Sequence, residues 1–400
     1  MMEKVVITHK FRLYPSKQQE AKLMETLELC RQTYNILLNE LNSQKVIDKS
    51  QIQGIIPNMK ICDSSFKKLY SKTMQYECYR LFSNLSSLAK SKNKRKVGRL
   101  RFKGKGWFKT FTYNQSGFKL IVTGKRYQTL HLSKIGSIPI RCHRKIKGKI
   151  KQITIKKEAS GKWHASIIEE TKKIIKKQQI RKAVGIDLGL TDIIYDSEGN
   201  KITNPRHLKK HCEKLSSLQR KVSRKKKGSR NRKRMRIKLT RQYEKLVNTR
   251  NDFLHKTSKY YVDNYDAIGI EDMTITSMVN GHLAKHILDA SWGKFRQMIA
   301  YKAERAGKLY IPVNHKGTTQ RCSQCGEEIA KDLSERVHKC HFCGFKAPRD
   351  YNSALEIKKL TLKRIFEIGQ ELSESTLVEM EALPTQLATT VNETRSYSLN

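Results

Sequence analysis

The sequence predicts a multidomain protein of the α+β and α/β classes: an N-terminal β-barrel with an inserted helical bundle, then an α/β domain with an inserted four-cysteine zinc module. Three observations predict this fold. Short apolar–polar alternations, typical of strands, follow one another between residues 110 and 168. Apolar residues recur every three or four positions in 23–41 and 208–253, as in helices. Two Cys-x-x-Cys pairs lie within 322–343.

The first 95 residues predict a strand followed by helices. Residues 7–13 alternate apolar and polar side chains, and Ser16 with Gln19 three residues later has the pattern of a capping box. Helical periodicity then predicts a long helix over 23–41 and a second over 66–89. We therefore expect a helical bundle at residues 15–95, inserted after the first strand.

Residues 1–14 and 96–178 are expected to form the β-barrel. Its short runs are separated by turns at Gly124-Lys125 and Ser160-Gly161. Trp107 and Phe108 stand among lysines and arginines, a mixture that suits a nucleic-acid backbone with bases stacked on the rings. The same rings also suit a hydrophobic core, so both interpretations stay open. Residues 171–182 are predicted to be a linker.

Residues 179–320 and 346–366 predict the α/β domain. Short strands at 184–186, 193–195 and 201–203 are expected to lie consecutively and antiparallel. A helical hairpin interrupted at Gly228-Ser229 follows them. The expected later elements are a buried strand at 267–270, a helix at 285–306, a strand at 309–313 and a last helix opened by Arg349-Asp350.

The charge of the chain indicates a polyanionic partner. Its 82 Lys and Arg against 36 Asp and Glu give a formal net charge of +46, which argues against an ordinary metabolic enzyme. Residues 220–241 hold thirteen Lys or Arg and no acid, and a solvated helix face would normally mix signs. We assign nucleic-acid contact to Arg220, Lys221, Arg224, Lys225, Lys226, Lys227, Arg230, Arg232, Lys233 and Arg234.

Hydropathy gives an expectation about location. The sequence holds no run of about 18 apolar residues that would span a membrane, and residues 1–10 lack the apolar core of a signal peptide. We expect a cytoplasmic, nucleoid-associated protein that is not secreted. Residues 367–400 hold six glutamates and one arginine and are expected to be an acidic, weakly ordered tail.

Four of the nine cysteines predict a structural zinc site at residues 321–345. Cys322, Cys325, Cys340 and Cys343 form two Cys-x-x-Cys turns, each followed by a glycine, and such turns direct two thiolates at one metal ion. Four thiolates close a tetrahedral shell around one Zn²⁺, so the ion should stabilise the fold rather than do chemistry. A disulfide pair and a redox motif are the rival interpretations, and His338 or His341 could replace one ligand. The other five cysteines stand mostly in helix-like or strand-like patterns and are expected to be small buried hydrophobes.

Three acids stand at the edges of the α/β domain. Asp187 ends its first strand, Glu271 ends its fourth, and Asp350 opens its last helix. Groups just beyond strand ends converge on one crevice of an open sheet. Each acid alone has an ordinary interpretation as a helix cap or a solvated group. Together they would repel one another unless cations neutralise them, and two Mg²⁺ ions suit carboxylates that meet a phosphate. The expected chemistry is phosphodiester hydrolysis.

The chain resembles the TnpB family of insertion-sequence proteins, which are held to be ancestral to the type V CRISPR effector nucleases. Lys10–Pro15 and residues 283–295 also look like that family. The motifs that carry the resemblance are Gly185-Ile186-Asp187-Leu188-Gly189, Gly269-Ile270-Glu271-Asp272, Thr319–Gly326, Cys340–Gly344 and Arg349-Asp350-Tyr351-Asn352-Ser353-Ala354. One departure is that Ser353-Ala354 stands where the family often has two alanines, a change that costs little in a helix's first turns.

The resemblance implies an RNA-guided DNA endonuclease. A RuvC-like domain of RNase H fold would hold Mg²⁺ with Asp187, Glu271 and Asp350 and cleave both strands of double-stranded DNA. The barrel would correspond to a wedge region and residues 15–95 to a recognition region, which together hold a guide RNA from the transposon end and a short target-adjacent DNA motif. The alternatives are a catalytically inactive RNA-guided DNA-binding regulator and a strand-joining transposase.

Overall fold

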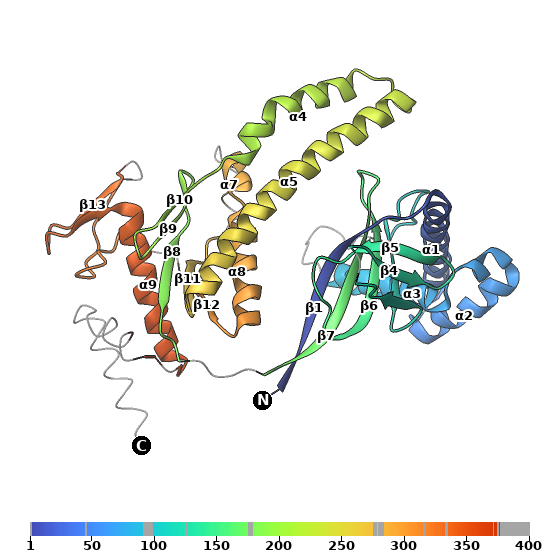
Figure 1. The fold of residues 1–400 in the computed structure, drawn as a ribbon, viewed down its shortest axis with the longest axis horizontal. Helices are drawn as coiled ribbons and strands as arrows, with labels where there is room; N and C mark the ends of the chain where they lie inside the picture. The colour runs from blue at the N-terminus through green and yellow to red at the C-terminus, as the bar shows by residue number, and fades with distance from the viewer. Residues whose placement is uncertain are drawn as a thin grey trace. The chain divides into compact units, whose positions relative to one another are not determined.

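The computed structural model describes residues 2–370 except 45, 91–98, 125, 175–178, 275–277, 279–283, 315–316 and 333–334, and in addition 372, 373 and 376. The chain divides into two compact units, Met1–Ile175 and Lys176–Asn400, which are treated separately here (Figure 1). No helix within the described ranges is both long and apolar enough to cross a membrane.

The first unit holds a seven-stranded antiparallel sheet with the order β2-β6-β7-β1-β5-β4-β3. β1 pairs with β7 along its whole length, from Met2 with Ile174 to Leu13 with Trp163. The expected linker is therefore wrong at its start, because residues 171–174 belong to a strand. The strands are β1 (Met2–Leu13), β2 (Thr110–Asn114), β3 (Phe118–Ile121), β4 (Gln128–Leu132), β5 (Gly136–Arg141), β6 (Lys149–Lys157) and β7 (Trp163–Ile174).

The two edges of this sheet meet at one corner. The edge strands β2 and β3 are joined by three residues, and both Gln115 and Gly117 have a positive φ there, 65° and 84°. A side chain at Gly117 would overlap the Tyr70 ring, so only glycine fits this corner. The expected barrel is thus present as a nearly closed sheet.

Between β1 and β2 the chain forms α1 (Lys17–Ser43), α2 (Lys49–Cys62), the 3₁₀ helix η1 (Ser64–Lys68) and α3 (Ser71–Ala89). The capping box of Ser16 and Gln19 is present. The helix expected over 66–89 is wrong in extent, because Tyr70 is extended and separates η1 from α3. The sequence did not predict α2, whose Gly54 and Pro57 both lower helix propensity. One hydrophobic core joins these helices to the sheet.

The second unit holds a five-stranded sheet with the order β10-β9-β8-β11-β12. β8, β9 and β10 are antiparallel neighbours, as predicted, whereas β11 is parallel to both β8 and β12. The strands are β8 (Ala183–Asp187), β9 (Asp192–Asp196), β10 (Lys201–Thr203), β11 (Ala267–Glu271) and β12 (Leu309–Val313).

Helices cover both faces of this sheet (Figure 1). Val184, Ile186, Ile268 and Ile270 pack into a core with α5 (Arg230–Asn264) and α8 (Trp292–Ala306). Ala183 and Ala267 pack on the opposite face with α9 (Arg349–Glu367). The pleat alternates side chains between these two cores, which determines where the acids at the strand ends point.

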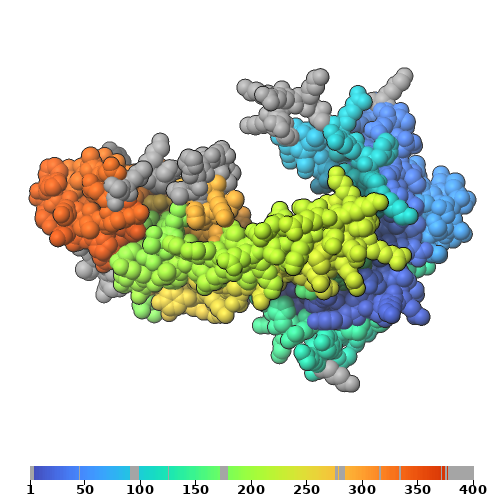
Figure 2. All heavy atoms as spheres, turned by 90° about the horizontal axis from the view of Figure 1, so that it is seen from above, coloured from blue at the N-terminus to red at the C-terminus, as the bar shows by residue number. Residues whose placement is uncertain are grey.

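α4 (His207–Ser223) and α5 form the predicted hairpin, which extends away from the sheet as a yellow-green arm (Figures 1 and 2). The helix expected at 285–306 is two helices, α7 (Ala284–Ala290) and α8, because Ser291 adopts a left-handed conformation with φ 57°. The two-stranded β13 (Val337–Lys339) and β14 (Lys346–Pro348) belong to the cysteine module. Most of the expected acidic tail lies outside the described residues, but Leu372 and Ser373 pair with Ile180.

Candidate active site and zinc centre

Asp187 and Glu271 point to the same face of the second unit's sheet. Ile186 and Ile270 are register partners on β8 and β11 and belong to the core beneath α5 and α8. Because successive side chains alternate, the residue that follows each isoleucine faces the α9 side. Neighbouring strands lie about 4.8 Å apart, so these two buried carboxylates come from adjacent positions.

Two glycines let α9 approach this face closely. Gly185 and Gly269 are register partners, each two residues before an acid and on the same face as that acid. A Cβ on Gly185 would overlap the Ala354 carbonyl oxygen and the Lys358 amide, both backbone atoms of α9. A Cβ on Gly269 would overlap the Thr361 hydroxyl. This role of the two glycines in the approach of α9 was not predicted from the sequence, although a glycine stands two residues before the acid in both strands.

α9 carries the third acid to the same place. Asp350 lies in its first turn, where the helix dipole favours a carboxylate, and Arg349 contacts it at 3.2 Å. Burial raises the pKa of Asp187 well above its ordinary value, and the charges of Glu271 and Asp350 raise it further. The charges of Glu271 and Asp350 therefore both act on Asp187, and the role of the three acids as a catalytic site stays a prediction.

Thr318 and Asn352 make hydrogen bonds at and beside the three acids. The buried Thr318 hydroxyl donates a hydrogen bond of 2.5 Å to Glu271 Oε1. Asn352, fully buried two residues after Asp350, accepts from the Ser323 N–H at 2.9 Å and donates to the Arg321 carbonyl at 2.8 Å. The Thr318 bond holds Glu271 from the segment just before the cysteine module. The two Asn352 bonds join α9, which carries Asp350, to the start of that module. Neither residue was expected, although Asn352 stands inside the motif that includes Asp350.

The four predicted cysteines meet at one point. Sγ of Cys322 lies 3.7 Å from Sγ of Cys343, Sγ of Cys325 lies 3.4 Å from that of Cys340, and all four lie within 4.8 Å of one another. A disulfide would need about 2.05 Å, whereas a tetrahedral zinc ion with bonds of about 2.3 Å separates its sulfurs by about 3.8 Å. The donor set fits one structural Zn²⁺.

The backbone of each turn supports that fit. Gly326 and Gly344 have φ values of 83° and 73°, and their N–H groups donate to the carbonyls of Cys322 and Cys340 at 2.9 and 3.1 Å. Burial acts to raise the pKa of Cys340, but hydrogen bonds from the Cys343 and Phe342 amides outweigh it and lower the pKa to about 7. A thiol with this pKa is readily available as a thiolate ligand.

Neither histidine joins the four sulfurs. Among the described residues these four cysteines are the one group of three or more His, Cys, Asp or Glu side chains whose ligand atoms lie close enough together to hold an ion as placed. His338 is fully buried and its Nδ1 contacts Lys331, and His341 is exposed. Among the other cysteines, Cys30 and Cys78 are buried as expected. Cys62 is exposed, which corrects the expectation for that residue.

The basic residues predicted to contact nucleic acid lie on the α4–α5 arm, and all of them except Arg232 are exposed. The ion pairs found in the described part of the chain engage none of them. Trp107, predicted with them, is 67% exposed. The expectation for Phe108 needs correction, because its ring is only 8% exposed and packs in the core of the first unit, with Arg80 over its face.

Comparison with known families and proteins matches three segments. A family described as "Probable transposase" matches residues 166–281, a "Cas12f1-like, TNB domain" matches 292–357, and a "Helix-turn-helix domain" matches 1–44. In this structure residues 2–44 form β1 and α1 rather than a helix-turn-helix. The match to the Cas12f1-like domain spans both Cys-x-x-Cys turns and Asp350.

Solved structures share the fold. A Cas12f1–guide RNA–target DNA complex matches with a TM-score of 0.54 and 14% identity, over 89% of this chain and 99% of that one. The mini RNA-guided endonuclease CRISPR-Cas_phi3 matches with a TM-score of 0.57 and 9% identity, over 90% and 92%.

Curated relatives match over nearly the full length. A putative RNA-guided DNA endonuclease of Streptomyces pristinaespiralis is 30% identical over 370 residues, which cover 89% of this chain and 90% of that protein. Putative RNA-guided DNA endonuclease InsQ of Escherichia coli is 28% identical over 87% of this chain and 90% of its own. TnpB-like protein L79 of Acanthamoeba polyphaga mimivirus is 22% identical over 90% and 74%. With this coverage and the matched domains, the chain belongs to the TnpB family.

Proposed function

We propose that this protein is an RNA-guided endonuclease that cleaves double-stranded DNA with Asp187, Glu271 and Asp350. The observation that carries the proposal is that these three acids, from β8, β11 and α9, share one face of the sheet and interact electrically. The activity class, DNA endonuclease guided by RNA, is that of the Streptomyces pristinaespiralis and Escherichia coli relatives.

Two Mg²⁺ ions fit the donor set, since three carboxylates offer only hard oxygen ligands and their mutual repulsion needs neutralising cations. When bound, Mg²⁺ would polarise the phosphate and lower the pKa of an attacking water. The residues of the protein itself position the carboxylates. Asp187 is buried and feels the charges of both other acids, Thr318 donates a hydrogen bond to Glu271, and Asn352 ties the first turn of α9 to the cysteine module.

A RuvC-like nuclease domain of RNase H fold is the proposed assignment for residues 179–320 and 346–366. Three antiparallel strands followed by two parallel ones, with acids ending the first and fourth, support it. Residues 321–345 are the proposed zinc module, whose single Zn²⁺ has a structural role. The barrel of 1–14 and 96–178 and the helices of 15–95 are the proposed wedge and recognition regions.

Guide RNA and target DNA explain the distribution of charge. Base pairing with the guide would read the target sequence, while the protein holds backbone and shape. The exposed lysines and arginines of the α4–α5 arm suit phosphate contacts, and Trp107 suits stacking. Binding should then weaken steeply as salt rises.

The test is to express the chain with its own genomic flank, sequence the RNA that co-purifies, and challenge the complex with a library of randomised target-adjacent motifs. We expect one RNA species and motif-dependent double-strand cleavage in Mg²⁺ that EDTA stops. Specific DNA binding without cleavage would instead identify the inactive regulator, and joining of DNA ends by the complex would identify the transposase.

A further inference from the structure

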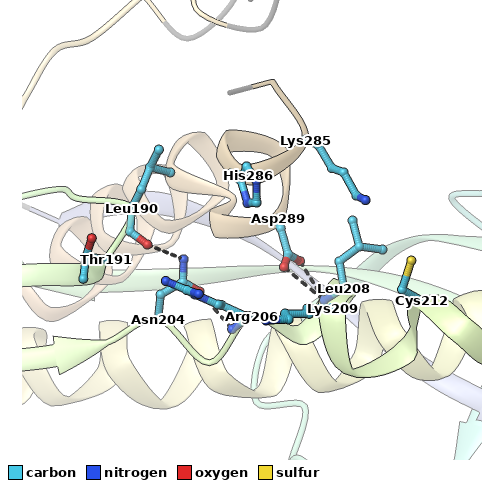
Figure 3. A pocket seen from close by; sticks show the side chains of 10 residues that line it. All are labelled: Leu190, Thr191, Asn204, Arg206, Leu208, Lys209, Cys212, Lys285, His286 and Asp289. Atoms are coloured by element: carbon cyan, nitrogen blue, oxygen red, sulfur yellow. Dashed lines mark hydrogen bonds between the residues drawn. The ribbon is translucent and has the colours of Figure 1, made fainter. Parts of the chain in front are cut away.

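A cavity of about 480 Å³ lies in the second unit beside the start of the α4–α5 arm (Figure 3). Its walls come from the loop after β8, the segment between β10 and α4, the first turns of α4, and α7. The lining residues are Leu190, Thr191, Asn204, Arg206, Leu208, Lys209, Cys212, Lys285, His286 and Asp289. Its volume lies in the range that proteins use for small organic ligands.

Two hydrogen bonds of one polar side chain, Asn204, hold the walls of the cavity in place. Asn204 donates to the Leu190 carbonyl at 3.0 Å and accepts from the Arg206 N–H at 3.0 Å. That second bond accompanies a left-handed backbone at Arg206, with φ 47°. Figure 3 shows Asn204 joining the two loops that form this side of the cavity. Non-glycine residues adopt this conformation uncommonly, so the loop is constrained rather than free.

The cavity combines apolar walls with a positive rim. Leu190 and Leu208 supply apolar surface, and Arg206, Lys209 and Lys285 are exposed cations around it. The one acid, Asp289, is already engaged: the Leu208 N–H donates to both of its oxygens and Arg250 contacts Oδ1 at 2.6 Å. The rim therefore favours a ligand with an apolar, flat part and a negative part.

The position of the cavity restricts the class of ligand further. Leu190 follows Asp187 by three residues, so its Cα lies at most about 11 Å along the chain from that of the acid. A DNA strand whose phosphate reaches the carboxylates can therefore extend to the cavity. A nucleotide has both parts that the cavity favours, a flat base and a phosphate.

We propose that this cavity receives one nucleobase of the DNA strand being cut, while Arg206, Lys209 and Lys285 hold the adjoining phosphates. The proposal rests on the proposed function, because the acids must be the cutting site for the strand to pass there. Inserting the base would fix the register of the strand, so the cavity would select which phosphate is hydrolysed.

A matched pair of lysines tests the rim. Lys209 and Lys210 are consecutive exposed residues of α4, and only Lys209 lines the cavity. In the RNA-loaded complex we expect Lys209→Ala to raise the KM for target cleavage about fivefold, as for loss of a phosphate contact, and Lys210→Ala to change it less than about twofold. Equal effects of the two variants would overturn the rim assignment.

Alkylation of the Cys212 thiol reports whether the cavity is occupied and does not depend on DNA cleavage. This thiol lines the cavity, whereas Cys62 is exposed in the first unit and serves as an internal reference. With the RNA-loaded Asp187→Ala protein, target DNA should slow alkylation of Cys212 by N-ethylmaleimide about fivefold or more and leave Cys62 unchanged, measured by peptide mass spectrometry. One abasic nucleotide, moved along the strand beside the cleavage point, should restore alkylation at a single position.

The outcomes separate the two proposals. Cleavage by the wild-type complex with unaltered Cys212 alkylation overturns the nucleobase cavity and leaves the nuclease standing. Protection that no abasic position relieves also overturns it, because the strand would then cover the cavity without entering it. Absence of both guide RNA and DNA binding overturns the proposed function and the cavity together.

Discussion

The four cysteines and the three acids of the second unit differ in how the chain brings them together. The four cysteines come from two short turns whose glycines and backbone amides are local, within residues 322–344. The three acids come from β8, β11 and α9, up to 163 positions apart, as 350 − 187 = 163 shows. A local site depends on spacing, whereas a dispersed site depends on how closely its elements pack.

Replacing Gly185 tests that difference with the largest expected effect on packing. Gly185→Ala places a Cβ against backbone atoms of α9, which cannot rotate away, so α9 must shift. We expect a loss of about 3 kcal/mol or more of folding free energy and cleavage reduced at least about 100-fold. Thermal unfolding and a cleavage time course measure the two effects.

Gly54→Ala is the matched control. Gly54 lies in α2 of the first unit, and an added Cβ meets nothing within 4 Å. This variant should be neutral or up to about 1 kcal/mol more stable, because alanine favours helix. If Gly185→Ala behaves like Gly54→Ala, close packing of α9 is not what assembles the acids.

Removing a zinc ligand tests the local site. Cys340→Ser should lose the metal, measured by elemental analysis against protein concentration, and should unfold the module between Thr318 and Asp350. The exposed Cys62→Ser is the control and should retain the metal. Cleavage should fall as well, because Thr318 and Asn352 link the module to the acids; unaltered metal content in Cys340→Ser would refute the zinc site.

Asn352→Ala separates positioning from zinc binding. The change leaves the Ser323 N–H and the Arg321 carbonyl without this partner in a buried region, which costs about 1–3 kcal/mol. We expect cleavage to fall about tenfold or more while zinc content stays at the wild-type level. Asn251→Ala, on α5 beside Lys294, is the control. Full activity of Asn352→Ala would show that this link does not position Asp350.

Glu77 lies in the first unit, away from both sites, and its replacement should have the smallest effect on cleavage. Burial raises its pKa to about 8, with Arg80 at 3.1 Å acting in the opposite direction. Because the folded state holds the proton more tightly, the contribution of Glu77 to stability is complete below pH ~4.5 and is lost as pH rises to about 8. Glu77→Gln should make the free energy of unfolding, measured with denaturant, decline less between pH ~4.5 and about 8. An unchanged pH profile would contradict the raised pKa.

Local patterns predicted local structure well in this chain. The Ser16 capping box, the cysteine turns and the hairpin break at Gly228-Ser229 each depend on residues close in sequence, and each is present. The bend at Ser291 was missed, since serine has no strong preference for a left-handed backbone and tertiary packing holds it there.

Burial and close approach depend on distant residues and were harder to predict. Phe108 stands among cations in the sequence, yet it packs against Tyr34, far from it in the chain. The roles of Gly185, Thr318 and Asn352 likewise exist only once α9 lies on the sheet. That Asp187 and Glu271 lie at neighbouring positions follows from the strand ends of one sheet edge, whereas the packing of α9 brings Asp350 to them. The catalytic role of the three acids stays a prediction.

The most direct measurement of the central claim is cleavage of a matched DNA target by the RNA-loaded complex in Mg²⁺ with each acid replaced. Asp187→Ala, Glu271→Ala and Asp350→Ala should each lower the rate at least about 1,000-fold while guide RNA and target binding stay near wild type. Asp272→Asn is the control, because this neighbouring carboxylate pairs with Arg296 instead. Cleavage at the wild-type rate by the Asp187→Ala complex would contradict the account.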